Sequence, residues 1–483
     1  MRSMSAAVLV ALLLLVAPSS ASAHDGDLRE YARGTWASFV AMTDERSGLP
    51  ADSLHKDGTR SVQTSTTNIG AYMWSAVVAH QLGLISRFEL VKRLSRTLST
   101  LKRMDRSDGG QYWNWYDHRT GDKLTYWPPN PGGTFLNWLS SVDNGWLAVG
   151  LRVVQNSVPE LSRPAGELYR TMDFGIYYVP ERNLVRFHIV PGDPSNSPCC
   201  YDTTVSESRI VDYIGIARGQ LPAKTYFQRW RTFPPTCDYS WLETKPVGEY
   251  RDYYGVRVFE GAHAYRDSLV VPSWGGSMFE ALMVDLFVPE AKWAPRSWGI
   301  NHPLTVRAQI LHGLLDAGYG VWGFSPANVP EGGYTVYGVD AIGLDPNGNP
   351  SNNDKTLVDR GFEGCPDRPA KPDPAPSAYT NGVVTPHAAF LALPYAKPYV
   401  QANLRRLAQF PEMYGRWGFR DSVNVKTRRA SDFYLSLDQG MIMAALGNEL
   451  GRDVMRKAFA DRELERGLRP VIGVEKFGAA PPK

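Results

Sequence analysis

The stretch ISRFELVKRLSRTLSTLKRM, residues 85–104, has the helical spacing of apolar residues that recurs along this chain. Its apolar residues recur at three- and four-residue steps, the spacing that gathers them on one face of an α-helix. The stretch is therefore predicted to be an amphipathic helix. The residues at these steps are Phe88, Val91, Leu94, Leu98 and Leu101.

Helical periodicity of this kind recurs along the chain, and each segment is followed by a loop rich in Gly, Pro, Tyr or Trp. Strand-like pieces are few and short, at residues 174–179 and 184–190. We therefore expect one all-α domain, from about residue 27 to residue 475, with small β-hairpins laid over it. The other segments predicted to be helical are residues 69–82, 144–154, 206–218, 277–286, 303–317, 386–392, 400–407 and 439–450.

The composition is typical of a globular protein. Of 483 residues, 43% are hydrophobic, and 52 Lys and Arg nearly balance 49 Asp and Glu. The formal net charge of +3 is small and the basic residues are evenly spread. This pattern argues against nucleic acid or a membrane surface as the partner.

The first residues have the features of a secretory signal peptide. Arg2 gives a positive start, residues 6–17 form a short apolar run, and Ala21-Ser22-Ala23 is a small-residue cleavage site. We interpret residues 1–23 as this signal peptide and expect a secreted protein. No later stretch approaches the roughly 18 uninterrupted apolar residues that a membrane span needs, so no membrane span is predicted.

Four cysteines are present: Cys199 and Cys200, which are adjacent, Cys237 and Cys365. In an oxidising compartment an even number suggests two disulfides, and the sequence leaves three pairings open. Because adjacent cysteines are hard to bridge to each other, the pairing of Cys199 and Cys200 with the two distant cysteines is favoured. A metal site is the weaker interpretation, since no CxxC or His-bearing spacing accompanies them.

The stretch SWGGSMFEALMVDLFVPE, residues 273–290, places a carboxylate, Glu280, inside an apolar run. Burial of an ionised carboxylate without a partner is costly, so Glu280 either lies on a solvated face or is held in a cleft for chemistry. The residues four positions before and after it, Gly276 and Val284, carry no charge and offer no ion pair. We therefore expect Glu280 to face a substrate or a buried arginine.

Seven stretches, in order along the chain, carry a family resemblance. They are TSTTNIGAYMWSAVVAHQLGLI (64–85), SSVDNGWLAVGL (140–151), YDTTVSESRIVDYIGIARGQLP (201–222), SWGGSMFEALM (273–283), VWGFSPAN (321–328), NGVVTPHAAFLALPY (381–395) and YLSLDQG (434–440). Together they resemble the glycoamylase-like domain family, which includes the glycoside hydrolase family 144 endo-β-1,2-glucanases and the related domain of cyclic β-1,2-glucan synthases. The resemblance implies an (α/α)6 toroid of six inner and six outer helices, with long aromatic loops and a substrate cleft at one mouth.

The resemblance also implies a glycoside hydrolase, whose chemistry uses one protonated and one ionised carboxyl group. Glu207, at a predicted helix start, is the expected general acid. Without the resemblance, the favoured interpretation is a carboxylate that stabilises a helix N-terminus and pairs with Arg209. Asp143 is the favoured base, although its place before an apolar helix also suits an N-cap.

Two more acidic residues complete the predicted catalytic set. Glu280 is placed at the mouth of the cleft, beside Trp274. Asp438 begins another apolar helix and is the reserve base, with helix capping again as the alternative.

Aromatic loops favour a sugar ligand, because the C–H faces of sugar rings are apolar and rest well on rigid aromatic rings. Many such rings simply fill protein cores. Of the tryptophans that fall in loops or at helix starts, namely Trp113, Trp115, Trp146, Trp274 and Trp322, the last three lie in the matched stretches. These three, together with Arg209, are therefore predicted to bind substrate.

No metal or other cofactor is expected for the chemistry. His387 lies in an apolar setting and is predicted to be structural. Asp and Asn alternate in one loop as they do in calcium-binding loops, but Gly is missing from the sixth position and an acid from the twelfth, so a solvated turn is favoured. The residues of this loop are Asp345, Asn347, Asn349 and Asp354.

The sequence thus favours a secreted, monomeric glycoside hydrolase, retaining or inverting, with inverting and endo-acting cleavage preferred. Its substrate is expected to be a β-glucan, with β-1,2-glucan as the first candidate, or another bacterial polysaccharide. A non-hydrolytic protein that binds a polysaccharide or oligosaccharide on the same toroid is one alternative, and a polysaccharide lyase is another. Tight binding without new reducing ends would indicate the binding protein. An unsaturated sugar product would indicate the lyase.

Overall fold

The computed structural model describes residues 21–344, 359–380 and 382–482. The predicted signal peptide lies outside these residues except for its last three, which begin the first helix. The loop weighed as a calcium site, residues 345–354, lies outside them altogether.

Helices are the main regular structure of the described chain, and each segment predicted to be helical contains a helix. In α4 (Arg87–Arg103), the three leucines at the predicted steps are buried and Val91 is partly buried against the core, whereas Phe88 is 75% exposed. The helices are α2 (Ala21–Met42), α3 (Thr66–Gln81), α4 (Arg87–Arg103), α5 (Ser141–Ser157), α6 (Ser162–Thr171), α7 (Arg209–Ala217), α8 (Lys224–Gln228), α9 (Met278–Leu282), α10 (Glu290–Trp293), α11 (Trp298–Leu311), α12 (Pro386–Leu391), α13 (Leu393–Leu407), α14 (Ser436–Gly451), α15 (Val454–Phe459) and α16 (Arg462–Ile472).

Helices far apart in the sequence form a closed circuit of contacts. α3 contacts α5 and α14, α5 contacts α7, and α12 contacts α14 and α9. The circuit closes between α7 and α9, where the Arg209 guanidinium donates to the backbone carbonyls of Glu280 and Ala281, both at 2.8 Å. We call these helices, α3, α5, α7, α9, α12 and α14, the inner helices.

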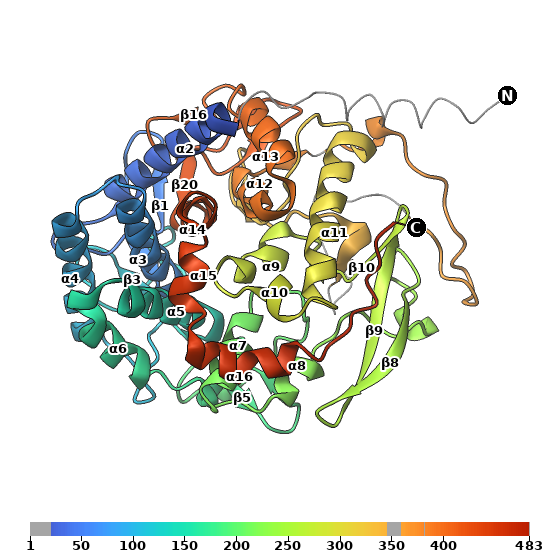
Figure 1. Ribbon diagram of the computed structural model, residues 1–483, viewed down its shortest axis with the longest axis horizontal. Helices are drawn as coiled ribbons and strands as arrows, with labels where there is room; N and C mark the ends of the chain where they lie inside the picture. The colour runs from blue at the N-terminus through green and yellow to red at the C-terminus, as the bar shows by residue number, and fades with distance from the viewer. Residues whose placement is uncertain (1–20, 345–358, 381, 483) are drawn as a thin grey trace.

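Other helices pack around the inner helices (Figure 1). α4 lies on α3, α6 on α5, α16 on α7, α11 on α9, α13 on α12 and α2 on α14. Because α2, α4, α6, α11 and α13 each precede or follow an inner helix, the chain moves repeatedly between the inside and the outside. Because of this alternation, a loop from an outer element leads into each inner helix, and these loops can surround the first turns of the inner helices.

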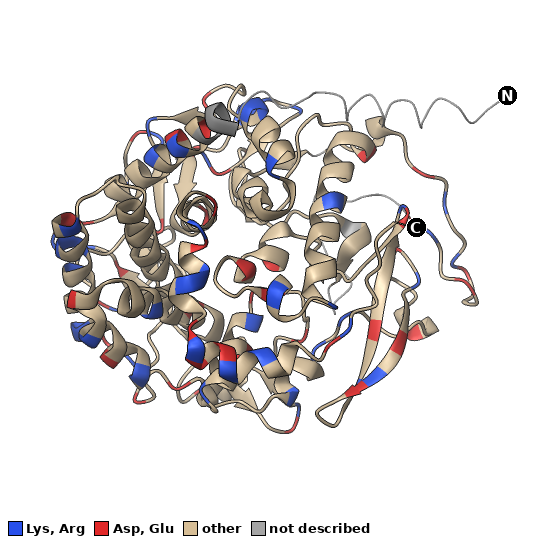
Figure 2. Cartoon of the chain, viewed as in Figure 1, with Lys and Arg blue, Asp and Glu red and all other residues tan. Residues whose placement is uncertain are grey.

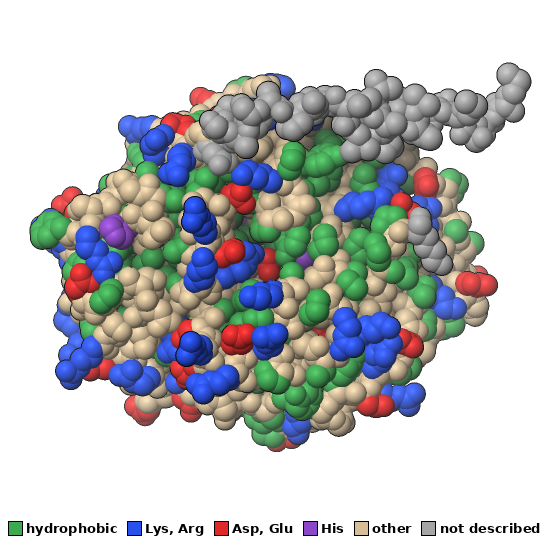
Figure 3. Space-filling model, viewed as in Figure 1, with side chains coloured by type: hydrophobic (Ala, Val, Ile, Leu, Met, Phe, Trp, Pro, Cys, Tyr) green, Lys and Arg blue, Asp and Glu red, His purple; other side chains and the backbone are tan. Residues whose placement is uncertain are grey.

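The surface mixes charges of both signs. Figure 2 shows Lys and Arg interspersed with Asp and Glu over the outer helices. On the face seen in Figure 3, basic, acidic and hydrophobic side chains alternate, so neither sign of charge dominates its described residues. Within the described chain, no helix combines the length and the apolar character needed to cross a bilayer.

One β-sheet was missing from the all-α prediction. β8 (Val247–Tyr253) and β9 (Val256–Tyr265) form a long antiparallel hairpin, with Val247 opposite Ala262 and Tyr253 opposite Val256, and β10 (Ser268–Val270) extends it. The hairpin lies outside the helices (Figure 1). The expected class is therefore right for the helical body and incomplete for this sheet.

The predicted strand at residues 174–179 is mostly wrong. The Asp173 side chain accepts from the backbone N–H of Gly175 and starts a 3-10 turn at Phe174–Tyr177, which leaves only β5 (Tyr178–Val179) as strand. β5 pairs with β6 (Leu184–Val185), inside the second predicted piece. The remaining strands are β1 (Ser53–His55), β2 (Gln63–Ser65), β3 (Trp115–Asp117), β4 (Leu139–Ser140), β7 (His188–Ile189), β11 (Ser273–Trp274), β12 (Ala327–Asn328), β13 (Tyr334–Thr335), β14 (Gly343–Leu344), β15 (Val383–Val384), β16 (Tyr414–Gly415), β17 (Gly418–Phe419), β18 (Val423–Asn424), β19 (Arg429–Ala430) and β20 (Phe433–Leu435).

The disulfide pairing differs from the favoured prediction. Cys199 bonds to Cys200, and Cys237 bonds to Cys365 with a Cα–Cα distance of 5.5 Å. Cys365 packs against a small separate cluster that contains Phe362, whereas Cys199 and Cys200 pack against a different cluster beside β5 and β6. Because the two clusters are separate, the adjacent cysteines do not reach the distant pair.

Candidate active site

Acidic side chains converge from the first turns of several inner helices. Asp143, Glu280 and Asp438 are each the third residue of their helix, α5, α9 and α14, and Glu207 stands two residues before α7. Carboxylates are favoured at these positions because the helix dipole is positive at the N-terminus. The four predicted catalytic residues thus occupy equivalent places in the fold.

Helix capping does not account for these carboxylates. Ser140 caps α5 by accepting from the backbone N–H of Asp143, and Ser277 caps α9 by accepting from that of Glu280, both at 3.2 Å. Asp438 lies inside α14 rather than at its cap position. The side chains of these acids are therefore available for other contacts.

A cleft of about 640 Å³ runs along Glu207 and Glu280. This volume lies within the range of small-molecule binding sites in proteins. The cleft is lined on its apolar side by Phe187, Tyr201 and Phe279, among others. Trp274, predicted to bind substrate, is half-buried in this lining.

Glu207 and Glu280 form a coupled pair. The backbone N–H of Glu207 donates to Glu280 Oε2 at 2.7 Å, and the indole N–H of Trp146 donates to Glu207 Oε2 at 2.5 Å. Burial and the neighbouring Glu280 charge raise the pKa of Glu207 well above its ordinary value. Burial also raises the pKa of Glu280, to about 7, against the hydrogen bonds that stabilise its charged form. Glu207 is therefore the member of the pair that keeps its proton at neutral pH.

Asp143 is held by three hydrogen-bond donors. The Thr67 hydroxyl donates to Oδ1 and the Ser140 hydroxyl to Oδ2, both at 2.6 Å. With its amide turned to satisfy both neighbours, Asn114 donates to Oδ2 at 3.0 Å and accepts from the Trp115 indole N–H at 3.0 Å. Burial raises the pKa of Asp143, and its charge in turn contributes to the raised pKa of Glu207.

A second buried acidic group joins Asp438 to Asp421, which the sequence analysis missed. Both residues are 1% exposed, and one carboxylate oxygen of each lies within 4.8 Å of the other. Burial raises the pKa of Asp421 to about 6 and, with the Asp421 charge, raises that of Asp438 well above its usual value. Asp421 lies in a loop beside Arg420, where nothing in the sequence separates it from an ordinary surface acid.

His387 completes this second group. Its Nδ1 lies 3.5 Å from Asp438 Oδ2, and burial lowers the pKa of the imidazole to about 3, so the ring is neutral. Side-chain oxygens and nitrogens of His387, Asp421 and Asp438 lie within 4.8 Å of one another, a spacing that could also hold a metal ion. The sequence had assigned His387 a structural role only.

Tyr334 connects the two acidic groups. Its side chain lines the cleft and is 54% exposed. Its hydroxyl interacts electrostatically with Asp438 and Asp421 in one group and with Glu207 and Glu280 in the other. The hydroxyl therefore stays protonated and available as a hydrogen-bond donor.

Three of the predicted substrate-binding residues are buried, which contradicts direct contact with a sugar. Trp146 is fully buried and serves as the donor to Glu207. Arg209, also fully buried, binds Glu290 through two nitrogens at 2.7 and 2.8 Å instead of pairing with Glu207. Trp322 is 1% exposed and belongs to the hydrophobic core.

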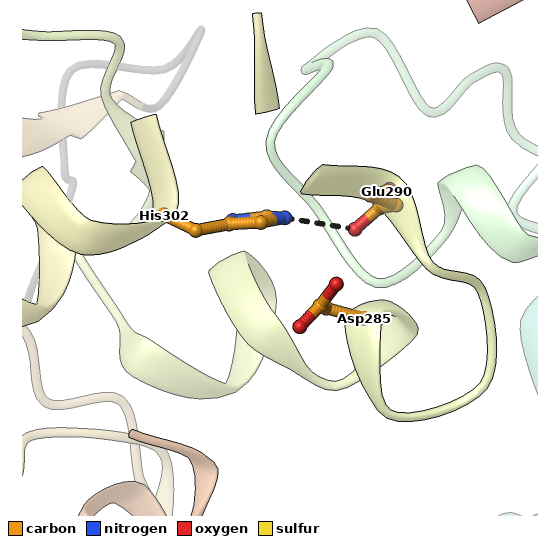
Figure 4. A group of neighbouring side chains, drawn as sticks. All are labelled: Asp285, Glu290 and His302. Atoms are coloured by element: carbon orange, nitrogen blue, oxygen red, sulfur yellow. Dashed lines mark hydrogen bonds and ion pairs between the residues drawn. The ribbon is translucent and has the colours of Figure 1, made fainter. Parts of the chain in front are cut away.

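A further buried group, Asp285, Glu290 and His302, also has metal-like spacing (Figure 4). Here arginines already supply the positive charge: Arg209 binds Glu290, and Arg456 binds Asp285 at 2.7 Å. Although burial opposes ionisation, Arg209 and His302 lower the pKa of Glu290 to about 2. The arrangement is an ion-pair network between helices, and the residues do not fit a metal site.

Two parts of the chain match known family models. Residues 244–462 match the family model described as putative glucoamylase, and residues 30–175 match a protein family of unknown function, DUF3131. Residues 244–462 are therefore similar to the glycoamylase family, as the matched stretches implied.

Individual relatives agree with this assignment. Cyclic β-(1,2)-glucan synthase NdvB of Rhizobium meliloti is 23% identical over 91% of this chain, which spans only 18% of that protein's length. The endo-β-1,2-glucanase of Chitinophaga pinensis superposes with a TM-score of 0.65 at 19% identity, over 95% of this chain and 99% of its own. A putative glucoamylase from Bacteroides caccae gives 0.64 at 18% identity, over 93% and 99%. At these identities the solved structures establish a shared fold.

Proposed function

We propose that this chain is a glycoside hydrolase that cleaves a β-glucan, with β-1,2-glucan as its first candidate substrate. The observation that carries the proposal is Glu207, a carboxyl group kept neutral beside Glu280 on an aromatic-lined cleft. A general acid must hold a proton at working pH and release it to the leaving glycosidic oxygen, and burial beside another carboxylate provides this. The fold shared with endo-β-1,2-glucanases supports the choice of substrate.

Asp143 is proposed as the base. It is half-buried, and its three donors orient the carboxylate and stabilise its charge. Asp438 and Asp421 are more deeply buried, and the pKa of Asp438 is raised well above its usual value by burial and by the Asp421 charge, so we propose that they set the charge of the site. Tyr334, Glu280 and Trp274 are proposed to position the sugar.

We further infer that the inner helices form the inner ring of an (α/α)6 toroid, and that residues 27–475 make up the catalytic domain. Two disulfides and the predicted signal peptide support secretion. No cofactor enters the proposed chemistry, because two carboxyl groups and water suffice for glycoside hydrolysis.

The proposal is tested by incubating the purified chain with a panel of polysaccharides that includes β-1,2-glucan and other β-glucans, and by measuring reducing ends and oligosaccharide masses. Release of short β-1,2-linked oligosaccharides is the expected result. Tight binding without new reducing ends would replace the hydrolase with a binding protein. Unsaturated products would replace it with a lyase.

A further inference from the structure

The disulfide between the adjacent residues Cys199 and Cys200 lies in the wall of the cleft. Both cysteines line the same hollow as Glu207, Glu280 and Trp274. Cys200 is 6% exposed and packs on Val179 and Leu184, while Cys199 is only half-buried. The disulfide therefore has one side seated on the protein and one side available to the cleft.

The surrounding backbone holds this position. Immediately after the cysteines, the backbone N–H of Tyr201 donates to the carbonyl of Val185 in β6 at 2.9 Å. Just before them, the Arg186 guanidinium donates to the carbonyl of Ser197 at 2.7 Å. The two cysteines are thus fixed on both flanks to the segment that contains β6.

An apolar surface continues from the disulfide toward the acid. The Tyr201 ring packs edge-on against Phe187 with their centroids 4.6 Å apart, and both rings line the cleft. The Tyr201 hydroxyl interacts electrostatically with Glu207 and Glu280. Glu207, Tyr201 and the disulfide therefore line one cleft, so a sugar chain bound along it can contact all three.

We propose that the Cys199–Cys200 disulfide is a specificity-determining surface that packs against a pyranose ring of the substrate. Divalent sulfur is soft, polarisable and weakly hydrated, which suits the apolar C–H face of a sugar. The bond joining adjacent residues keeps both sulfurs in one place on the wall. The inference rests on the proposed function, since it assumes a glucan in this cleft.

The Cys237–Cys365 disulfide provides a matched control. Its two cysteines are absent from the residues that line this cleft, and Cys365 packs in another cluster. Removal of each disulfide in turn therefore separates an effect on the cleft wall from a general effect of losing a crosslink.

The test measures oligosaccharide affinity by calorimetry. Three proteins are compared: the inactive Glu207→Gln variant, the same variant with Cys199→Ala/Cys200→Ala, and the same variant with Cys237→Ala/Cys365→Ala. Loss of the sulfur contact is expected to weaken Kd about three- to tenfold for the first pair and to leave it unchanged for the second. Circular dichroism checks that each variant is folded. Equal Kd values for all folded variants would overturn the proposal.

Reduction provides a second readout without mutation. A phosphine reductant converts each disulfide to two thiols and becomes the phosphine oxide, taking its oxygen from water. It is expected to weaken binding by the parent and by Cys237→Ala/Cys365→Ala, and to leave Cys199→Ala/Cys200→Ala unchanged. Free thiols at Cys199 and Cys200 in the oxidised protein, found by mass spectrometry, would also overturn the proposal.

Binding without turnover by the parent enzyme would reject the hydrolase alone, whereas no binding of any glucan would reject both the hydrolase and the role of the disulfide.

Discussion

The backbone N–H of Glu207 points at the carboxylate of Glu280, with 2.7 Å between the nitrogen and Oε2. This contact fixes two carboxyl groups from sequence positions 73 residues apart at one place on the cleft. Because the hydrogen bond stabilises the charged form of Glu280, and that charge raises the pKa of Glu207, the pair divides into a charged and a neutral member.

Glu207→Gln is expected to lower kcat by about 10²–10⁴ while leaving oligosaccharide affinity and melting temperature nearly unchanged. The amide keeps the size of the side chain and cannot deliver a proton. Glu181→Gln, an exposed change on the turn after β5, is the control and should behave as the parent. Near-normal turnover by Glu207→Gln would remove this residue from the role of acid.

Glu280→Gln and Trp146→Phe are expected to shift the pH profile of kcat in opposite directions. The reaction needs protonated Glu207, so activity falls as pH rises through its pKa. Loss of the Glu280 charge lowers that pKa and moves the basic limb to lower pH. Loss of the Trp146 donor, which stabilises the charged form, raises the pKa and moves the limb to higher pH. Shifts in the same direction would contradict the assignment.

Asp143→Asn is expected to lower kcat by about 10²–10⁴, with added azide restoring part of the turnover. A small anion can replace a missing base but cannot repair a misfolded site. Asp122→Asn, an exposed change, serves as the control. A loss of activity that azide does not restore, accompanied by a lower melting temperature, would assign Asp143 a structural role.

Treatment with EDTA followed by dialysis is expected to leave turnover unchanged, because the raised pKa of Asp438 favours its neutral form and so reduces the negative charge that would hold a cation. The measurement is initial rate before and after chelation, followed by addition of Ca²⁺, Mg²⁺ or Zn²⁺. Activity that is lost and then restored by one ion, but not in Asp438→Asn, would place a cation at His387, Asp421 and Asp438.

The disulfides should differ in their contribution to stability. Cys237 and Cys365 are 128 residues apart, so Cys237→Ser/Cys365→Ser is expected to lower the free energy of unfolding by about 2–4 kcal/mol. Cys199→Ser/Cys200→Ser opens only the smallest loop and should cost less, by the same chain-entropy argument. Denaturant titrations of the two variants measure the difference, and equal losses would show that loop closure does not govern these crosslinks.

Sequence periodicity predicted the helical body because helices such as α4 bury one regular stripe of leucines. It missed α6 and α16, although both are strongly amphipathic, and it missed the β8–β9 hairpin. β8 is largely exposed and so lacks the alternation of buried and exposed residues that marks a strand. The pairing of Cys199 with Cys200 was disfavoured because adjacent cysteines are hard to bridge. The fold decides the pairing instead, because it places Cys237 beside Cys365 and away from the adjacent cysteines.

The site was predictable where the acids occupied helix starts inside matched stretches, as Glu207 and Glu280 do. Asp421 follows a two-residue strand and joins the site only through tertiary contact with Asp438. Trp146 and Arg209 were predicted to bind substrate, but sequence does not report that both side chains are fully buried, with Trp146 donating to Glu207 and Arg209 to Glu290. Whether a side chain supports an acid or touches the substrate depends on packing that no local pattern records.

The central claim is that Glu207 delivers a proton to a glycosidic oxygen in this cleft. A crystal structure of Glu207→Gln with a β-1,2-linked glucose oligosaccharide tests it most directly. The account predicts a sugar chain across the cleft, with a glycosidic oxygen within hydrogen-bond distance of the residue 207 amide. An oligosaccharide bound elsewhere, or in the cleft with its glycosidic oxygens beyond reach of residue 207, would contradict it.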